Sequence, residues 1–246
     1  MKVRMLLFTA GIILLLLSSC DHRVFDRPPQ SDSPNRIMPL GASRVEGNRP
    51  EFESFRYELW KKLIENGWSV DFIGTRSDEA RYPEVNGSSF DRDHQGVSGW
   101  TSGEILAELP GWLEETGAPD IVLFSSPGGN DALQALPFDD AVSNINAIID
   151  LIQEANPEVR ILMEQMAPGT SGIMTTELSS YIAGLHREVS TIAAEKATDS
   201  SELTAVDMFT GFSDDLLADD VHYNEAGARF IADRYYAALE AVLVSE

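Results

Sequence analysis

The sequence is poor in the residues that build disulfide frameworks and metal centres. Its 246 residues include one cysteine and four histidines. A single cysteine cannot form an internal disulfide, and the chain has neither a CxxC nor an HExxH pattern. These absences exclude a disulfide-stapled domain and the common zinc sites, and we expect neither a metal nor an organic cofactor.

Positive charge is also scarce. Lysines and arginines number 18 against 40 aspartates and glutamates, and the formal net charge is −22. Such a chain repels nucleic acid and bare anionic membrane surfaces, so neither is an expected partner. The GxxxxGK[ST] pattern of phosphate loops and the GxSxG pattern of the α/β-hydrolase elbow are both missing.

A long apolar run occurs near the N-terminus, where a short basic head precedes residues 5–17. This is the layout of a secretory signal, and the run is short for a membrane span. Residues 17–20, LSSC, resemble the lipobox of bacterial lipoproteins. The resemblance implies that residues 1–19 are removed and that Cys20 carries lipid. We therefore expect a location in the bacterial cell envelope, outside the cytoplasm, with membrane contact through the anchor alone; the alternative is a plain signal peptide.

The rest of the chain divides into a tether and one domain. Residues 20–35 are polar and rich in proline after the cysteine, which predicts a flexible tether. From 36 to 246, short apolar strands alternate with amphipathic helices. This pattern predicts an α/β fold, a three-layer α/β/α sandwich around a five-stranded parallel sheet of flavodoxin-like order 2-1-3-4-5. The expected strands are 37–40, 69–73, 120–124, 159–163 and 203–206, and the expected helices are 53–66, 102–115 (interrupted at Pro110-Gly111), 139–155, 177–196 and 224–243.

One histidine stands in a suggestive setting. His222 precedes the last helix, and Asp219 lies three residues before it. On a turn, this spacing can place a carboxylate against Nδ1 and leave Nε2 free to accept a proton from a serine. Acidic residues are common at helix starts, so the spacing alone also fits an ordinary helix start that contains a histidine.

Several polar segments follow predicted strands at the same edge of the sheet. Ser43 follows the first strand, residues 125–131 follow the third, and Asp219 and His222 follow the fifth. Open parallel sheets place their sites outside the carboxyl ends of the strands. Asn130 could donate an amide N–H to a developing oxyanion. These segments together predict an acyl-transfer site, although each turn alone could be ordinary.

Four blocks in order carry a family resemblance: IMPLGAS, GVSGWT, GGND and DDVHYN. Together they resemble the SGNH hydrolases, the GDSL-type esterases, over about residues 36–245. The resemblance implies a nucleophile at Ser43, a histidine and carboxylate at His222 and Asp219, and an oxyanion hole made by Ser43, Gly99 and Asn130. It also implies an acyl-enzyme intermediate.

The context of the second block points to a branch of that family. VDFIGT and FDRDHQGVSGWT resemble the carbohydrate acetylesterases, which include acetyl xylan esterases. The implied function is hydrolysis of O-acetyl groups on an acetylated saccharide. The alternatives are a lysophospholipase, thioesterase or arylesterase on the same site, or a catalytically impaired carbohydrate-binding lipoprotein.

Two departures from the family pattern bear on activity. Ala42 stands where the first block usually has an aspartate that helps to hold the nucleophile turn. FSSPGGND also carries one residue more than the usual spacing, which could shift the register of Asn130. We expect an active esterase, with Arg44 and Glu46 forming an ion pair that braces the turn in place of the missing carboxylate.

Residues around the second block have alternative interpretations. Asp91, Asp93 and His94 could bind a cation or a sugar, but pairing with Arg92 within the 75–100 loop is the simpler expectation. Trp100 and Trp112 could form a platform for a sugar ring. Tryptophan packs in the core at least as often.

Overall fold

A computed structural model describes residues 33–245 of the chain. Within these residues, seven strands form one mixed sheet in the order β3-β4-β1-β5-β6-β7, with β2 also paired to β1. All neighbours are parallel except β3 and β4, which are antiparallel. The strands are β1 Arg36–Gly41, β2 Asp71–Phe72, β3 Arg76–Ser77, β4 Asp93–Gly96, β5 Ile121–Phe124, β6 Arg160–Gln165 and β7 Leu203–Asp207.

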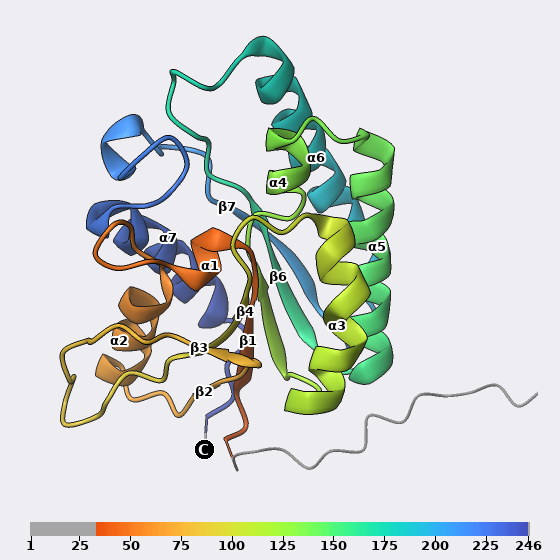
Figure 1. Ribbon diagram of the computed structural model, residues 1–246. Coiled ribbons are helices and arrows are strands. Elements are labelled where there is room, and N and C mark those ends of the chain that lie inside the picture. Colours follow the sequence, from red (N-terminus) through yellow and green to blue (C-terminus); the bar gives the residue numbers. More distant parts are fainter. Residues whose placement is uncertain (1–32, 246) are drawn as a thin grey trace, which may run out of the picture.

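Helices cover both faces of the sheet. In Figure 1, α2 and α7 lie on one face, and α3, α5 and α6 lie on the other. The short helices α1 and α4 sit near the edge at which the parallel strands end (Figure 1). The helices are α1 Ser43–Glu46, α2 Arg56–Glu65, α3 Ser102–Thr116, α4 Gly129–Leu133, α5 Phe138–Ala155, α6 Thr176–Lys196 and α7 Glu225–Leu239, with a 3₁₀ turn at Asp214–Leu216.

The strands are apolar on both faces because both are covered. Met38 and Leu40 of β1 pack in one hydrophobic core with α3, α5 and α6. Ile37 of the same strand packs in a second core with α2 and α7. Successive side chains of a strand point to opposite faces, so one strand contributes to both cores.

The predicted three-layer fold is confirmed, and the predicted order 2-1-3-4-5 corresponds to β2-β1-β5-β6-β7. The predicted count of five strands is wrong, because the expected 75–100 loop contains β3 and β4. β4 pairs with the carboxyl half of β1, while β2 pairs with its amino half. The β4 sequence, DHQG, has no apolar residue and therefore gives no strand pattern.

The predicted interruption of the helix over 102–115 is also wrong. α3 runs unbroken with Pro110 inside it. Proline removes one backbone donor from a helix interior. The helix is held on either side of that position by a capping box between Thr101 and Glu104 and by the buried side chains of Leu109 and Leu113, which pack in the core shared with α5.

Residues 1–32, which include the predicted signal, Cys20 and most of the tether, lie outside the described residues. Asn35, at the end of the expected tether, is buried. Its Nδ2 donates to the carbonyls of Ser69 and Val244, both at 2.9 Å, and its Oδ1 accepts from the Val244 N–H at 2.8 Å. Asn35 thus joins the start of the domain to its end. No helix within 33–245 is long and apolar enough to cross a membrane.

Candidate active site

The turn after β1 places Ser43 at the edge where the parallel strands end. Ser43 is the first residue of α1, and two N–H groups of that helix donate to the Ala42 carbonyl at 3.0 Å each. The turn packs closely against its neighbours. A Cβ on Gly41 would lie 2.8 Å from a carbonyl oxygen of the β5–α4 loop, and one on Gly96 would lie 2.6 Å from the Glu46 nitrogen. Glycine at both positions lets the Ser43 turn lie directly on the sheet.

The structure brings together the three residues that the sequence predicted as a triad. His222 Nε2 lies 2.9 Å from Ser43 Oγ, and His222 Nδ1 lies 2.7 Å from Asp219 Oδ2. The other carboxylate oxygen of Asp219 accepts the backbone N–H groups of Val221 at 2.9 Å and of His222 at 2.8 Å. The carboxylate therefore fixes both the ring and the backbone of the histidine.

The surroundings of His222 and Asp219 affect the position of the imidazole ring and the charge of the carboxylate. The Phe52 ring stacks on the imidazole, with centroids 3.9 Å apart and planes 15° from parallel. Partial burial opposes ionisation of Asp219, but hydrogen bonds from Val221 and from His222 hold its pKa below the ordinary value. Asp219 is therefore a carboxylate at neutral pH. Only the charged form can stabilise a protonated imidazole beside it.

Gly99 and Asn130 line the same cavity as Ser43 and His222. Gly99 has a φ of +82°, a backbone conformation that glycine adopts without strain. Asn130 is the second residue of α4, and its Nδ2 donates to the Trp100 carbonyl at 2.7 Å. An amide group carries two N–H donors, and this bond uses one of them. The additional residue before Asn130 thus does not remove this side chain from the cavity.

Glu46 braces the loop that carries Gly99. Its Oε2 accepts the Ser98 N–H at 2.7 Å, and its Oε1 accepts from Arg76 at 2.6 Å. Partial burial opposes ionisation, yet the hydrogen bonds from Ser98 and the nearby Arg76 charge lower the pKa of Glu46. The carboxylate joins α1 directly to the second block.

The expected ion pair between Arg44 and Glu46 is wrong. Arg44 turns the other way, and its guanidinium donates to the backbone carbonyls of Val221 at 2.9 Å, Ala167 at 2.7 Å and Pro168 at 3.0 Å. Side chains two residues apart on a helix do not face each other, and the sequence pattern did not predict that residues 43–46 are helical.

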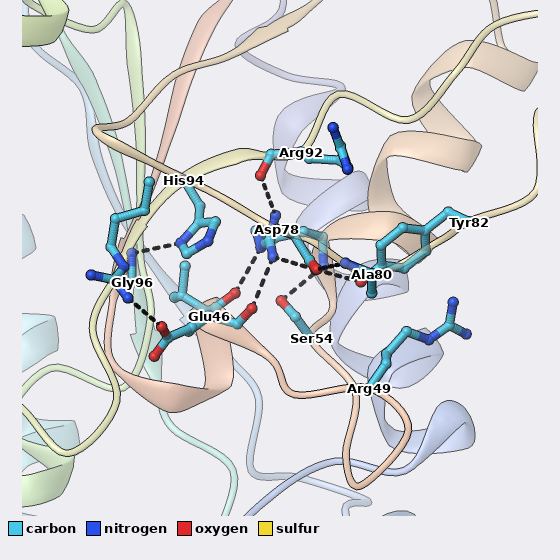
Figure 2. Close-up of polar contacts among 12 residues, drawn as sticks. Glu46, Arg49, Ser54, Asp78, Ala80, Tyr82, Arg92, His94 and Gly96 are labelled. Atoms are coloured by element: carbon cyan, nitrogen blue, oxygen red, sulfur yellow. Dashed lines mark hydrogen bonds and ion pairs between the residues drawn. The ribbon is translucent and has the colours of Figure 1, made fainter.

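A buried arginine closes the other end of α1. Arg56 is fully buried, and it donates to the carbonyls of Val45 at 2.7 Å and Glu46 at 2.9 Å. It pairs with Asp78 at 3.0 Å, and Asp78 also accepts the Tyr82 hydroxyl at 2.5 Å. Figure 2 shows Asp78 and Tyr82 among the polar contacts of this region. This role could not be predicted from the sequence, because Arg56 is one of several charged residues of α2 and the pattern does not show which of them is buried.

His94 and Asp91 support the fold away from the cavity. Burial, and then the nearby charges of Arg56 and Arg76, lower the pKa of His94 to about 2, and its Nδ1 accepts a backbone N–H two residues on at 3.0 Å (Figure 2). Asp91 accepts the Phe72 N–H at 2.6 Å. The expected pairing with Arg92 is wrong: no ion pair within residues 33–245 includes its side chain.

The cavity above Ser43 has a volume of about 660 Å³. Polar residues from α1 and its neighbouring loops, including Glu46, Asn48 and Ser98, contribute to its lining. The β5, β6 and α6 region contributes apolar side chains: Phe124, Met166, Ile173, Met174, Leu178 and Ile182. No group of three or more metal-ligating side chains gathers in the part of the chain that the structure describes.

The two tryptophans have different surroundings. Trp100 lines the cavity, and Trp112 does not. Their rings stack on each other at 5.5 Å and 20°, and both pack against the larger core. One face of Trp100 is therefore already occupied by Trp112, so the pair cannot act as a two-ring platform for a sugar.

Comparison with known proteins supplies the family. Residues 64–230 match the sequence model of the GDSL-like Lipase/Acylhydrolase family. The chain has no significant match among curated protein sequences.

Solved structures resemble the whole domain. An acetyl esterase S10A mutant with acetate ion is 26% identical with a TM-score of 0.73, covering 85% of this chain and 97% of its own. A carbohydrate esterase family 3 protein from Talaromyces cellulolyticus is also 26% identical with a TM-score of 0.73, covering 86% and 100%. A family 3 carbohydrate esterase of Clostridium thermocellum is 27% identical with a TM-score of 0.68, covering 85% and 99%.

Proposed function

Since this chain belongs to the GDSL-like lipase/acylhydrolase family and is a carboxylic ester hydrolase, we propose that it cleaves esters through Ser43, His222 and Asp219. The observation that carries the proposal is the 2.9 Å contact between Ser43 Oγ and His222 Nε2, backed by the 2.7 Å contact between His222 Nδ1 and Asp219. A nucleophile, its base and the group that orients the base thus form one chain of contacts.

The first half-reaction follows from this arrangement. His222 Nε2 accepts the Ser43 proton as Oγ bonds to the ester carbonyl carbon, and Asp219 stabilises the imidazolium that forms. The carbonyl oxygen becomes an oxyanion, which accepts hydrogen bonds from the Ser43 and Gly99 N–H groups and from the Asn130 amide. His222 then returns the proton to the leaving alkoxide, and the alcohol departs from a Ser43 acyl-enzyme.

Water completes the cycle. His222 accepts a proton from water as the water oxygen attacks the acyl carbonyl, and the same three donors hold the second oxyanion. Return of that proton to Ser43 Oγ releases the carboxylic acid and restores the starting state. The chemistry uses only groups of this chain and a water molecule.

The proposed substrate is an O-acetyl group on a carbohydrate. The resemblance to an acetyl esterase and to two family 3 carbohydrate esterases supports an acetyl group and a sugar alcohol. Glu46, Asn48 and Ser98 give the cavity polar groups that could accept from and donate to sugar hydroxyls.

The apolar part of the cavity favours a second candidate: an ester or thioester with a longer acyl chain, as a lysophospholipase, thioesterase or arylesterase would cleave. Ile173, Met174 and Leu178, which are half-buried, offer an apolar surface that an acetyl group is too small to cover. A series of p-nitrophenyl esters from acetyl to decanoyl decides between the two. The highest kcat/KM at acetyl supports the acetylesterase, and a maximum at about six or more carbons supports the second candidate.

Ser43→Ala is the direct test of the mechanism. The variant should lose p-nitrophenyl acetate hydrolysis and labelling by a fluorophosphonate probe, while Ser180→Ala, an exposed serine of α6, should retain both. Full activity in Ser43→Ala would remove the mechanism. A wild-type chain that fails to label but binds acetylated sugar would instead select a catalytically impaired binding protein.

We also propose that the protein is anchored outside the cytoplasm by lipid on Cys20. The lipobox-like LSSC sequence supports this. Cells expressing the full chain and fed radiolabelled palmitate should label it, and Cys20→Ala should abolish the label and release the protein from the membrane fraction. A wild-type chain that stays unlabelled would contradict the proposal.

A further inference from the structure

A carboxylate with no place in the proposed reaction lies beneath the site. Glu164, near the carboxyl end of β6, is completely buried. Its Oε2 accepts the Ser126 N–H at 2.8 Å and lies 3.2 Å from the Ser126 hydroxyl. Burying a carboxylate is costly unless a charge and hydrogen bonds compensate. Its presence in an apolar strand, ILMEQ, therefore requires an explanation.

The compensating charge is Arg44, the residue directly after the proposed nucleophile. Arg44 Nη1 lies 3.4 Å from Ser126 Oγ, so the Ser126 hydroxyl bridges the guanidinium and the Glu164 carboxylate. Burial raises the pKa of Glu164, and the Arg44 charge opposes that effect. The guanidinium also lies over the Tyr223 ring, 4.8 Å from its centroid.

This bridge connects the segments that build the site. Arg44 donates to Ala167 and Pro168 in the β6–α6 loop and to Val221 beside His222. Glu164 holds Ser126, whose φ of +48° is unusual for a residue other than glycine. The same short loop continues into α4 and Asn130.

Other hydroxyl groups face the same carboxylate. Tyr235 and Ser125 are directed at Glu164, but neither hydroxyl nor Glu164 Oε1 has a partner of good hydrogen-bond geometry. Ser126 thus makes the hydrogen bonds that Glu164 accepts, and Arg44 reaches the carboxylate through the Ser126 hydroxyl, 3.4 Å from Nη1.

We propose that Glu164 and Arg44 are a pair of positioning residues that hold Ser43, the Asn130 loop and the His222 loop in register for ester hydrolysis. The effect on catalysis rests on the proposed function of Ser43. The structural connection between the Ser43 turn, the Asn130 loop and the His222 loop does not depend on that function.

The test is a double-mutant cycle with Glu164→Gln and Arg44→Met. Each single variant should lower kcat for p-nitrophenyl acetate by about 10- to 100-fold with KM within about twofold, because small displacements of reacting groups cost rate rather than binding. The double variant should be no slower than the slower single variant, since both changes break one bridge. Glu158→Gln, an exposed glutamate just before β6, is the matched control and should match wild type.

Arg44→Lys tests whether Arg44 acts through its positive charge or through its several N–H donors. The lysine ammonium group keeps the charge but cannot reach several carbonyls at once. The kcat of Arg44→Lys should therefore stay close to that of Arg44→Met. Full recovery of kcat in Arg44→Lys would mean that charge alone matters, and additive losses in the double variant would mean that the two residues act separately. Either result overturns the proposal.

Hydrogen exchange distinguishes failure of this proposal from failure of the proposed function. In Glu164→Gln, the rate of amide hydrogen exchange should rise together in residues 125–130, 166–168 and 219–222. The exchange rate in α5 should stay as in the wild-type protein. If Ser43→Ala stays active, the proposed function fails, while this result still supports the tie between the segments. Unchanged exchange in all three segments overturns the proposal whether or not Ser43 is the nucleophile.

Discussion

Ser43 Oγ and His222 Nε2 lie 2.9 Å apart, although 179 residues separate them in the sequence. Their meeting depends on the parallel sheet. β1 ends just before Ser43, and β7 leads into the loop that contains His222, at the same edge. A hydroxyl and an imidazole at this distance are arranged for proton transfer without a large movement of either loop.

The carboxylate behind His222 should matter more than its acidic neighbour. Asp219→Asn removes the negative charge that stabilises the imidazolium, and we expect kcat to fall by between about 10² and 10⁴-fold, since the same change in a buried triad costs about 10⁴-fold. Asp220→Asn, on the neighbouring residue whose carboxylate accepts the Thr170 hydroxyl, should lower kcat little. Steady-state kinetics on p-nitrophenyl acetate measure both, and equal losses in the two variants would argue against the assignment.

The amide of Asn130 should contribute to the transition state rather than to binding. Asn130→Ala should lower kcat by about 10²- to 10³-fold with little change in KM, as loss of one oxyanion donor does. Asn146→Ala, in α5, removes an amide that also donates to a backbone carbonyl but lies outside the cavity, and should leave kcat unchanged. Thermal melts of both variants control for loss of folded protein. A large rise in KM at constant kcat would assign Asn130 to substrate binding instead.

The buried arginine of α2 should be a major contributor to stability. Arg56→Leu leaves Asp78 without its ion-pair partner and the carbonyls of Val45 and Glu46 without the guanidinium donor, and we expect it to lower the free energy of unfolding by about 3–5 kcal/mol. Arg229→Leu breaks an exposed pair with Glu225 and should cost less than about 1 kcal/mol. Urea denaturation measures both values. Similar costs at the two positions would show that burial does not decide the strength of these pairs.

Asp91 should make stability depend on pH in an unusual direction. Burial raises its pKa from 3.8 to about 6, only partly opposed by hydrogen bonds from the Phe72 and Asp93 N–H groups. A carboxyl group with a raised pKa in the folded state contributes stability that is complete below its unfolded value and is lost as pH rises through the folded value. Between about pH 4 and pH 6 this loss is at most about 3 kcal/mol.

Asp91→Asn keeps an oxygen acceptor for Phe72 but does not titrate. The difference in unfolding free energy, wild type minus variant, should therefore fall as pH rises from 4 to 7. Asp199→Asn, in an exposed turn, serves as the control. Urea denaturation at each pH supplies the curves. Parallel pH curves for wild type and Asp91→Asn would show that this carboxyl group ionises normally in the folded protein.

The sequence by itself determined the layers of the fold and the candidate residues that the fold then brought together. Apolar runs and helical periodicity depend on which faces are buried, so they placed β1, β5, β6 and β7 and most helices. Ser43, Asp219 and His222 could be selected because the carboxyl ends of parallel strands meet at one edge. The role of β4 was not visible, since its DHQG sequence pairs through backbone groups that carry no side-chain pattern.

Only the tertiary structure decided how the site is supported. Arg44 bonds to Ala167, Pro168 and Val221 rather than to Glu46, and Glu46 bonds to Ser98 and Arg76. These partners lie far away in sequence, and several are backbone carbonyls that any residue provides. A charged side chain is held by whatever donors and acceptors the fold places beside it, and that arrangement exists only after the chain has folded.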